Sequence, residues 1–314
     1  MLCASTRGAM SAFWDSWRKE IIRGATLFCV VVALGFFVRY VAITTRHAVS
    51  TTLPAVLRNL PKDFGADIAD EGEGARKTGT TWSVHHKMRP KQWVWIRNIR
   101  GTITVEPTRS ESLVVTAVKT YRSSDTARVR LMAAPYEGGI AVCALWPDNE
   151  EDCSPGKGFH GGRTHGNDVA VDFTVQLPGR VALGASTQVG DVRVSGASGP
   201  LMVTTVSGDV HAETARGSVE AASVNGSVHA VVRALGDSGG VSVTTVNGSV
   251  TAELPKHLDA DVEANTINGS IFTDFPLQVE GKFTSHSLKG TVGRGGREVH
   301  IQTVNGSITL KKAS

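Results

Sequence analysis

The stretch that decides the fold is Thr245-Val246-Asn247-Gly248-Ser249-Val250, because it is one of five copies of the same hexapeptide. Each copy reads Thr or Ser, Val or Ile, Asn or Ser, Gly, Ser or Asp, and Val or Ile. The other four copies begin at Thr205, Ser223, Thr266 and Thr303. Asn-Gly favours a tight corner, and β-branched residues favour the strands that flank it. Repetition of this kind predicts a repeat architecture.

The spacing of the corners indicates the kind of repeat. From Gly190 onward, the equivalent glycines recur after 18, 18, 22, 21, 21 and 16 residues. This period is too short for helical repeats, and a leucine ladder is absent. We therefore expect an all-β fold, namely a β-solenoid (β-helix-like) of about 18–22 residues per coil with coils stacked in sequence order; a β-sandwich with the same turns is the alternative. The predicted corner glycines, including degenerate copies, are Gly101, Gly190, Gly208, Gly226, Gly248, Gly269, Gly290 and Gly306.

The composition sets limits on the class of protein. The chain has 314 residues, of which 41% are hydrophobic and only 6% aromatic, so it can form a substantial aliphatic core. The 33 basic and 29 acidic residues nearly cancel, and no long Lys/Arg block is present, which argues against nucleic-acid binding. Four cysteines in a chain of this length do not make a disulfide scaffold.

An apolar run near the N-terminus predicts a membrane anchor. Residues 24–38 form an apolar run without charged side chains, and extension to residues 21–43 reaches spanning length. Basic residues precede the run, so the N-terminal segment is expected in the cytoplasm and the bulk of the chain outside. A cleaved signal peptide is the alternative. The predicted organisation is a cytoplasmic segment 1–20, a transmembrane signal anchor 21–43 in the cytoplasmic (inner) membrane, a tether 44–88 and a β-strand-repeat domain 89–314.

The repeat region resembles a known family. From about Trp93 to Lys312 the chain is similar to the bacterial "putative adhesin" family of β-strand-repeat proteins, a domain-of-unknown-function family. The resemblance rests on residues 98–105, on residues 142–147 and on the recurring Val-Asn-Gly-Ser corners. It implies an extracytoplasmic β-solenoid, often membrane-anchored, with no defined reaction and no catalytic residues to assign.

Two cysteines lie in the exported part of the chain. Cys143 and Cys153 are close in sequence, and an oxidising compartment favours a disulfide between them. The alternative adds His160 and His165 to make a Cys2His2 zinc site, although the cysteine spacing differs from the short pairs of structural zinc sites.

The residues favour a binding function over catalysis. We expect a membrane-anchored scaffold or adhesin-like interaction surface without a cofactor, whose partner is an envelope protein or a glycan. The alternative is a carbohydrate-active parallel β-helix enzyme that uses Asp191 and Asp209, which lie one coil apart, as paired carboxylates. Serine occupies the same position in later coils, which is typical of a turn residue.

Overall fold

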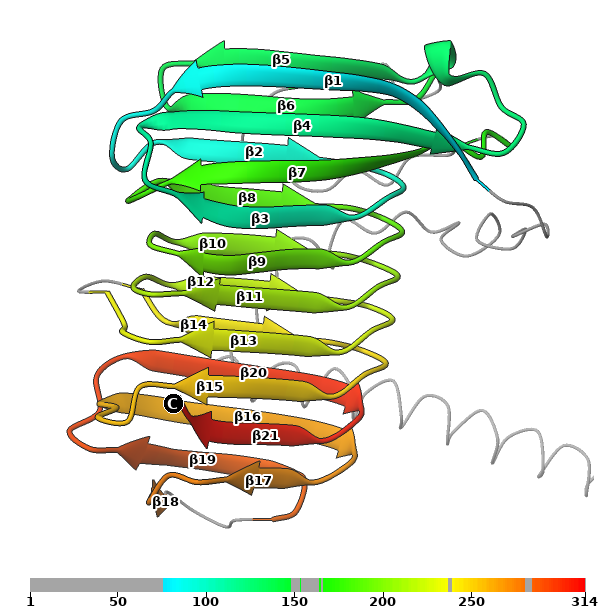
Figure 1. Cartoon of the computed structure of the whole chain (residues 1–314). Coiled ribbons are helices and arrows are strands. Elements are labelled where there is room, and N and C mark those ends of the chain that lie inside the picture. Colours follow the sequence, from blue (N-terminus) through cyan, green and yellow to red (C-terminus); the bar gives the residue numbers. More distant parts are fainter. Residues whose placement is uncertain are drawn as a thin grey trace, which may run out of the picture. The chain divides into compact units, whose positions relative to one another are not determined.

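The computed structural model describes residues 76–147, 153, 164, 166–236, 239–279 and 284–313. These residues form strands β1 to β21 and a short 3-10 turn, η2 (Thr126–Arg128). The strands make two long sheets that face each other (Figure 1). The all-β prediction is therefore confirmed.

The first sheet, called sheet A, has ten strands and holds the strand that follows each corner. Its spatial order is β1 (Lys77–Lys87), β4 (Ser112–Tyr121), β7 (Ala170–Pro178), β3 (Ile103–Thr108), β9 (Val192–Ala197), β11 (Val210–Thr214), β13 (Val228–Val232), β15 (Val250–Leu254), β21 (Ile308–Lys312) and β17 (Ile271–Thr273).

The second sheet, called sheet B, has eleven strands and holds the strand that precedes each corner. Its spatial order is β18 (Gln278–Val279), β19 (Ser287–Val292), β16 (Ala260–Asn268), β20 (Glu298–Asn305), β14 (Val241–Thr244), β12 (Val219–Ala222), β10 (Leu201–Thr204), β8 (Ala182–Ser186), β2 (Trp93–Arg97), β6 (Gly139–Leu145) and β5 (Arg130–Tyr136).

The middle of the domain is a regular, solenoid-like stack. From β8 to β15 the chain alternates between the sheets, and each strand pairs in parallel with the strand two positions later. The register aligns Val192, Val210, Val228 and Val250, so like residues lie above one another. In this part the coils stack in sequence order, as predicted.

At both ends the expected sequence order is wrong. The coil β2–β3 lies between β6–β7 and β8–β9. The last coil, β20–β21, lies between β14–β15 and β16–β17 (Figure 1). The inserted coil continues the same corner bonds as the other coils: Thr303 donates to the Gly248 carbonyl, and Thr266 donates to the Gly306 carbonyl. Because every coil carries the same corner residues, a coil distant in sequence can occupy this place as well as the next one along the chain.

Antiparallel strands close both ends of the stack. β1, β4 and β7 pair antiparallel at one end, as do β5 and β6, while β19 pairs antiparallel with β16 and β18 at the other. The edge strands are protected in the usual ways: β5 carries Pro135, β1 begins and ends with lysine, and β17 and β18 are very short.

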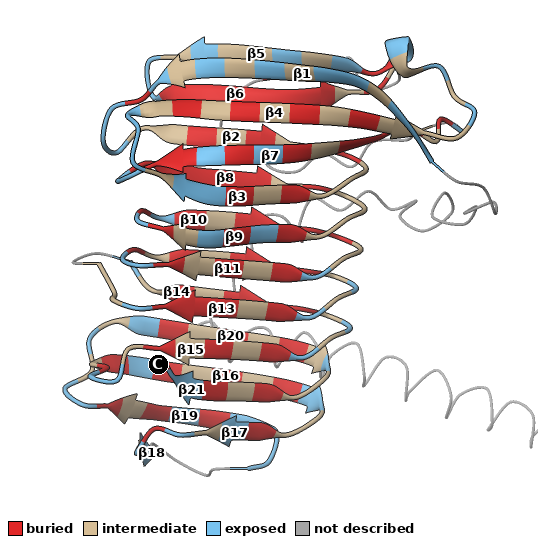
Figure 2. Ribbon diagram, in the orientation of Figure 1, coloured by how far each residue is buried: buried red, intermediate tan, exposed pale blue. Residues whose placement is uncertain are grey.

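The core fills the space between the sheets. Inward residues alternate with outward ones, as in the buried Val210, Ala212 and Thr214 of β11, and the alternation runs through both sheets (Figure 2). Trp146 and Phe173 are the largest fully buried side chains of the described residues, and the rest of that set is aliphatic. Each fully buried Val, Ile or Leu stabilises the fold by about 1.5–3 kcal/mol.

The carboxylate of Asp168 stabilises the turn that follows β4 through hydrogen bonds. Asp168 Oδ2 accepts hydrogen bonds from the backbone N–H groups of Arg122 and Ser123 at 3.1 and 3.0 Å, and Oδ1 accepts one from that of Ser124 at 3.1 Å. Desolvation raises the pKa of Asp168, but the hydrogen bonds from Ser123, Ser124 and Arg122 outweigh it and lower the pKa to about 2.

The domain begins earlier than the sequence indicates. β1 starts at Lys77 and pairs with β4, so the end of the predicted tether, 44–88, is part of the sheet. The predicted segments 1–20 and 21–43 lie outside the described residues, as does most of the tether. Within the described residues, no helix has the length and apolar character to cross a bilayer.

Candidate interaction surface

The hexapeptide forms one continuous corner column along the stack. Backbone bridges join the residues that precede the glycines, from Arg100 through Val189 and Ser207 to the later asparagines. In space, the glycines follow the order Gly101, Gly190, Gly208, Gly226, Gly248, Gly306 and Gly269.

One predicted corner is corrected. Gly290 lies inside β19 and pairs antiparallel with Val262, away from the corner column. The strands on both sides of β19, which are β16 and β18, pair with it antiparallel, so this segment does not continue the corner column.

Close approach of neighbouring coils explains the glycines. A Cβ added at Gly226 would lie under 3.0 Å from the carbonyl oxygen of Gly208, and the same holds at Gly248 against Gly226. Gly269 meets the Gly306 carbonyl in the same way. Any side chain at these positions would therefore push the coils apart.

The first residue of each of these hexapeptides donates a hydrogen bond to the glycine carbonyl of the preceding coil. The hydroxyls of Thr205, Ser223 and Thr245 donate to the carbonyls of Gly190, Gly208 and Gly226 at 2.8, 2.9 and 2.8 Å. All three hydroxyl residues are buried. Since an unpaired buried carbonyl is costly, this hydroxyl is as much a part of the corner as the glycine.

The third residue builds an amide ladder. Asn247 Nδ2 donates to Asn225 Oδ1, Asn305 Nδ2 donates to Asn247 Oδ1, and Asn268 Nδ2 donates to Asn305 Oδ1, at 2.8, 2.7 and 2.7 Å. The ladder gives asparagine a structural role at these corners.

The carboxylates of Asp191 and Asp209, the candidate catalytic pair, accept hydrogen bonds from backbone N–H groups. Asp191 Oδ1 accepts from the Asp209 N–H, and Asp209 Oδ1 accepts from the Ser227 N–H, both at 2.8 Å. Asp191 Oδ2 also pairs with Arg193 Nη2 at 2.6 Å. The hydroxyls of Ser227 and Ser249 continue the same column and accept from the next serine N–H at 3.4 and 3.3 Å. These bonds agree with the turn interpretation of both aspartates.

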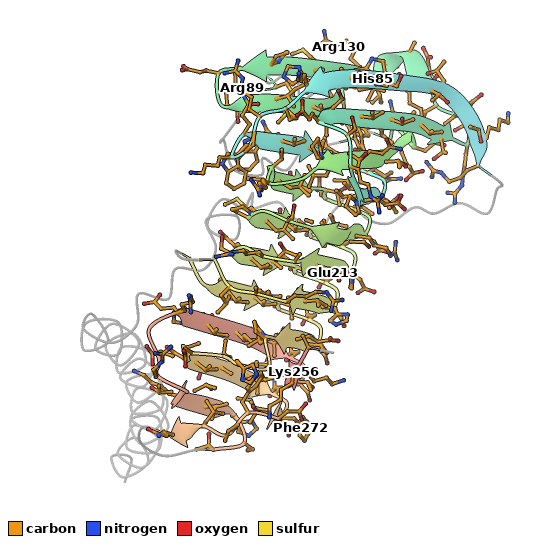
Figure 3. All side chains as sticks on the ribbon, turned by 60° about the vertical axis from the view of Figure 1, so that its left-hand side comes forward. His85, Arg89, Arg130, Glu213, Lys256 and Phe272 are labelled. Carbon is orange, nitrogen blue, oxygen red and sulfur yellow. A yellow bond between two sulfur atoms is a disulfide. The ribbon has the colours of Figure 1, made fainter. Side chains whose placement is uncertain are left out.

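A groove of about 480 Å³ lies on the outer face of sheet A, over β11, β13 and β15. The cross-strand register places Arg193, His211, His229 and Thr251 in one row across the sheet. Glu253 and Lys311, which pair across β15 and β21, line it beside this row. Figure 3 shows the outward side chains along the stack, with Glu213 of β11 labelled beside this region.

The two histidines are the distinctive chemistry of the groove. Their ring centroids are 4.9 Å apart in an edge-to-face arrangement, and His229 Nε2 lies 3.0 Å from Glu253 Oε1. Burial lowers the pKa of His211, and the neighbouring His229 lowers it further, whereas Glu213 and Glu253 act in the opposite direction. The groove therefore holds hydrogen-bond donors and acceptors of both charges.

Sequence reasoning missed this groove, although a signal was present. The motif Val-His-Ala follows two successive corners, at residues 210–212 and 228–230. Alternation after a corner turns the middle residue outward, so the two histidines had to meet on neighbouring strands.

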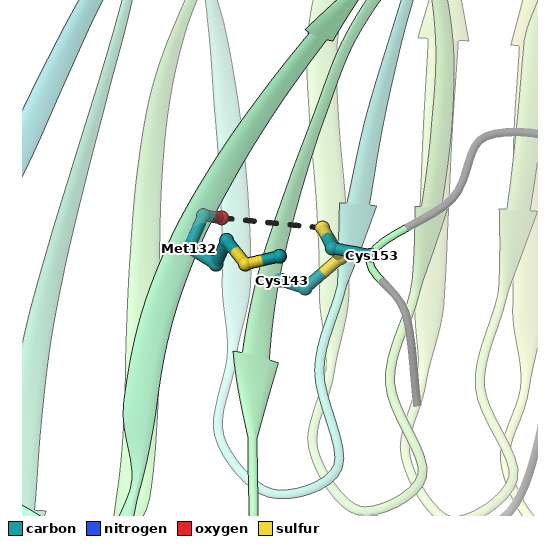
Figure 4. Close-up of a disulfide and its surroundings, with 3 residues drawn as sticks. All are labelled: Met132, Cys143 and Cys153. Carbon is teal, nitrogen blue, oxygen red and sulfur yellow. Dashed lines mark hydrogen bonds between the residues drawn. A yellow bond between two sulfur atoms is a disulfide. The ribbon is translucent and has the colours of Figure 1, made fainter. Parts of the chain in front are cut away.

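The predicted disulfide is confirmed. Cys143 and Cys153 are bonded, with Cα atoms 5.8 Å apart, on the outer face of β6 (Figure 4). Trp95, Ala134 and Leu145 pack around the pair. Both thiols are consumed by this bond, which removes them from the alternative zinc site. His160 and His165 lie outside the described residues, which contain no cluster of three or more His, Cys, Asp or Glu able to hold a metal ion.

The fold and the corners define a class: an all-β domain of two sheets whose solenoid-like coils meet at glycine corners. Residues 179–311 match the model of the Toastrack DUF4097 family. The match confirms the resemblance seen in the sequence to a domain-of-unknown-function family.

Solved structures with a similar course of the chain have low sequence identity to this protein. One is described as a "putative cell adhesion protein" from Clostridium sporogenes, with 13% identity, coverage of 74% of this chain and 100% of that chain, and a TM-score of 0.46. Another is described as a "putative adhesin" from Bacteroides fragilis, with 11% identity, coverage of 74% and 97%, and a TM-score of 0.34. No curated protein matches the chain.

Proposed function

We propose that this protein is a membrane-anchored, extracytoplasmic scaffold without catalytic activity, which contacts an envelope protein or a glycan through the outer face of sheet A. The observation that carries the proposal is the groove over β11, β13 and β15, where outward side chains from successive coils converge. Parallel stacking holds these side chains in fixed register, and a repeat stack presents such a row as an extended binding surface.

The chemistry of the groove suits a polar partner. Arg193 and Lys311 supply positive charge, Glu253 supplies negative charge, and the histidines and Thr251 add hydrogen-bonding groups. Because these groups stand on strands rather than loops, a partner would bind with little ordering of the protein.

Site-specific photo-cross-linking tests the surface. A photoreactive amino acid replaces Thr251 of β15 in the full chain within cells, and the control replaces Ser242 of β14. Both are small, partly exposed residues of the same coil, but they face outward from opposite sheets. Adducts from position 251 and none from 242 support the proposal. Adducts of equal yield from both positions, or none from 251, overturn it.

The anchor needs a separate experiment. Support for it comes from the apolar run at residues 21–43 and the basic residues before it. The full chain is expected to sediment with membranes and to be digested by protease added outside spheroplasts, whereas a variant lacking residues 21–43 stays in the soluble fraction. Protection of the full chain from external protease would refute the extracytoplasmic location.

A further inference from the structure

Four corners of the column offer the same local chemistry for a spontaneous modification. Asn225, Asn247, Asn268 and Asn305 are each followed by Gly-Ser, and all four asparagines are exposed. In an Asn-Gly pair the glycine nitrogen meets little steric obstruction on its way to the asparagine side chain, because glycine has no Cβ. Sequence alone would therefore predict equal reactivity at the four positions.

The structure makes them unequal, because a backbone hydrogen bond occupies the attacking nitrogen at three corners. The N–H of Gly226 donates to the Asn247 carbonyl at 3.0 Å. The N–H groups of Gly248 and Gly306 donate to the next coil in the same way, each at 2.9 Å. Gly269 is the last glycine of the column, and among the described residues its N–H has no hydrogen-bond acceptor.

The side chain of Asn268 is also held less firmly than the others. In the amide ladder, the Oδ1 atoms of Asn225, Asn247 and Asn305 each accept a bond from a neighbouring asparagine. Asn268 donates through Nδ2 but ends the ladder, so no asparagine donates to its Oδ1. It also lies beside β17, a three-residue edge strand, and short edge elements open locally more readily than central strands.

We propose that Asn268 is the selective deamidation site of this protein. The Gly269 nitrogen gives up its proton to water and attacks Cγ of Asn268. The Cγ–Nδ2 bond breaks, and Nδ2 takes up the protons needed to leave as ammonia, which produces a five-membered succinimide. Water then opens the ring to aspartate or isoaspartate. One water is consumed and one ammonia is released, without oxidation or reduction.

The product would alter the end of the column. Deamidation places a carboxylate next to the corner where His286 Nδ1 lies 2.9 Å from the Gly269 carbonyl oxygen. Isoaspartate also adds a backbone carbon between Asn268 and Gly269. The extra carbon displaces the Asn268 carbonyl, which accepts from Gly306 N–H and joins the coils β16–β17 and β20–β21.

Peptide mass spectrometry of the full chain tests this inference with internal controls. After incubation at mildly alkaline pH, deamidation at residue 268 is expected to exceed that at residues 225, 247 and 305 by about tenfold, since each of those requires the loss of one extra hydrogen bond. The same incubation in urea is expected to equalise the four rates.

The outcomes separate structural from sequence control. Equal rates at the four asparagines in the native protein, a faster rate at any of the other three, or no reaction at residue 268 while the urea sample reacts would each overturn the assignment. An Asn268→Gln variant supplies a chemical control, because its side chain is one methylene longer and cannot form the five-membered ring, so the signal at residue 268 is expected to disappear.

Discussion

A methyl group at one corner glycine should weaken the whole stack. In Gly226→Ala, the new Cβ meets the Gly208 carbonyl oxygen at less than 3.0 Å. Backbone atoms cannot turn aside as a flexible side chain can, so the two coils must separate locally. Gly226 also has a φ of +157°, so the substitution tests the close approach and the backbone conformation of the corner together.

The magnitude follows from the bonds that cross this junction. The Gly208 N–H donates to the Asn225 carbonyl at 3.0 Å, and the Asn225 N–H donates to the Val206 carbonyl at 2.7 Å. The Ser223 hydroxyl donates to the Gly208 carbonyl at 2.9 Å. A separation of roughly 1 Å breaks bonds of this length. Three such bonds at about 1 kcal/mol each give an expected loss of about 3 kcal/mol in the free energy of unfolding.

Urea denaturation followed by far-UV circular dichroism measures this loss. The matched control is Gly179→Ala, because a Cβ at Gly179 meets only the Ser198 hydroxyl, at an ordinary 3.6 Å. The control is expected to change the free energy of unfolding by no more than about 1 kcal/mol. If both variants unfold at the same urea concentration, the close-approach explanation of the corner is refuted.

Three further substitutions test other parts of the structure. Thr245→Val removes a buried hydroxyl that is bonded to a corner carbonyl, so it is expected to lower the free energy of unfolding by about 1–2 kcal/mol, measured by heat or urea. The control Thr251→Val, on the outer face, is expected to change it by less than about 0.5 kcal/mol. Asp168→Asn should cost about 1 kcal/mol at neutral pH, after allowance for solvent screening. Replacing Cys143 and Cys153 together by alanine should cost about 2–3 kcal/mol under oxidising conditions.

Each of these has an outcome that contradicts it. Equal losses in the two threonine variants would show that the hydroxyl bond contributes nothing. Because the folded-state pKa of Asp168 is lowered, its contribution is present above pH 4 and is lost as the pH falls toward about 2. Unfolding curves of wild type and Asp168→Asn that stay parallel through this range would refute that contribution. For the cysteine pair, a wild-type free energy of unfolding that reductant leaves unchanged would refute the contribution of the disulfide to stability.

The sequence predicted the local structure better than the order of the coils. Val241 and Val243 before the corner, and Val250 and Ala252 after it, stand two residues apart on their strands, which places each pair on one face, and all four are fully buried. Strand alternation is a local property that the sequence predicts well. The insertion of β20–β21 between β14–β15 and β16–β17 selects among distant coils that share the same corner motif, and spacing alone does not encode that choice.

On the surface, too, local features are predictable from the sequence, whereas features that depend on which strands become neighbours are not. Proximity of Cys143 and Cys153 in sequence sufficed for the disulfide, whereas the groove requires knowing which outward residues become neighbours. Gly290 shows what local sequence does not predict. Its sequence neighbours match a degenerate corner, yet it lies inside β19 and pairs antiparallel with β16.

The inserted final coil fixes the order in which this domain can be completed. Until residues 298–312 have been synthesised, β14 and β15 each lack one of their two neighbours, and β16–β17 has no coil to connect it with the rest of the stack. Folding that follows synthesis from the N-terminus must pause at that junction, with valine-rich strand edges open to the wrong partner. Even a short truncation at the C-terminus would thus leave a gap inside the domain, between β14–β15 and β16–β17, and not at the end of the stack.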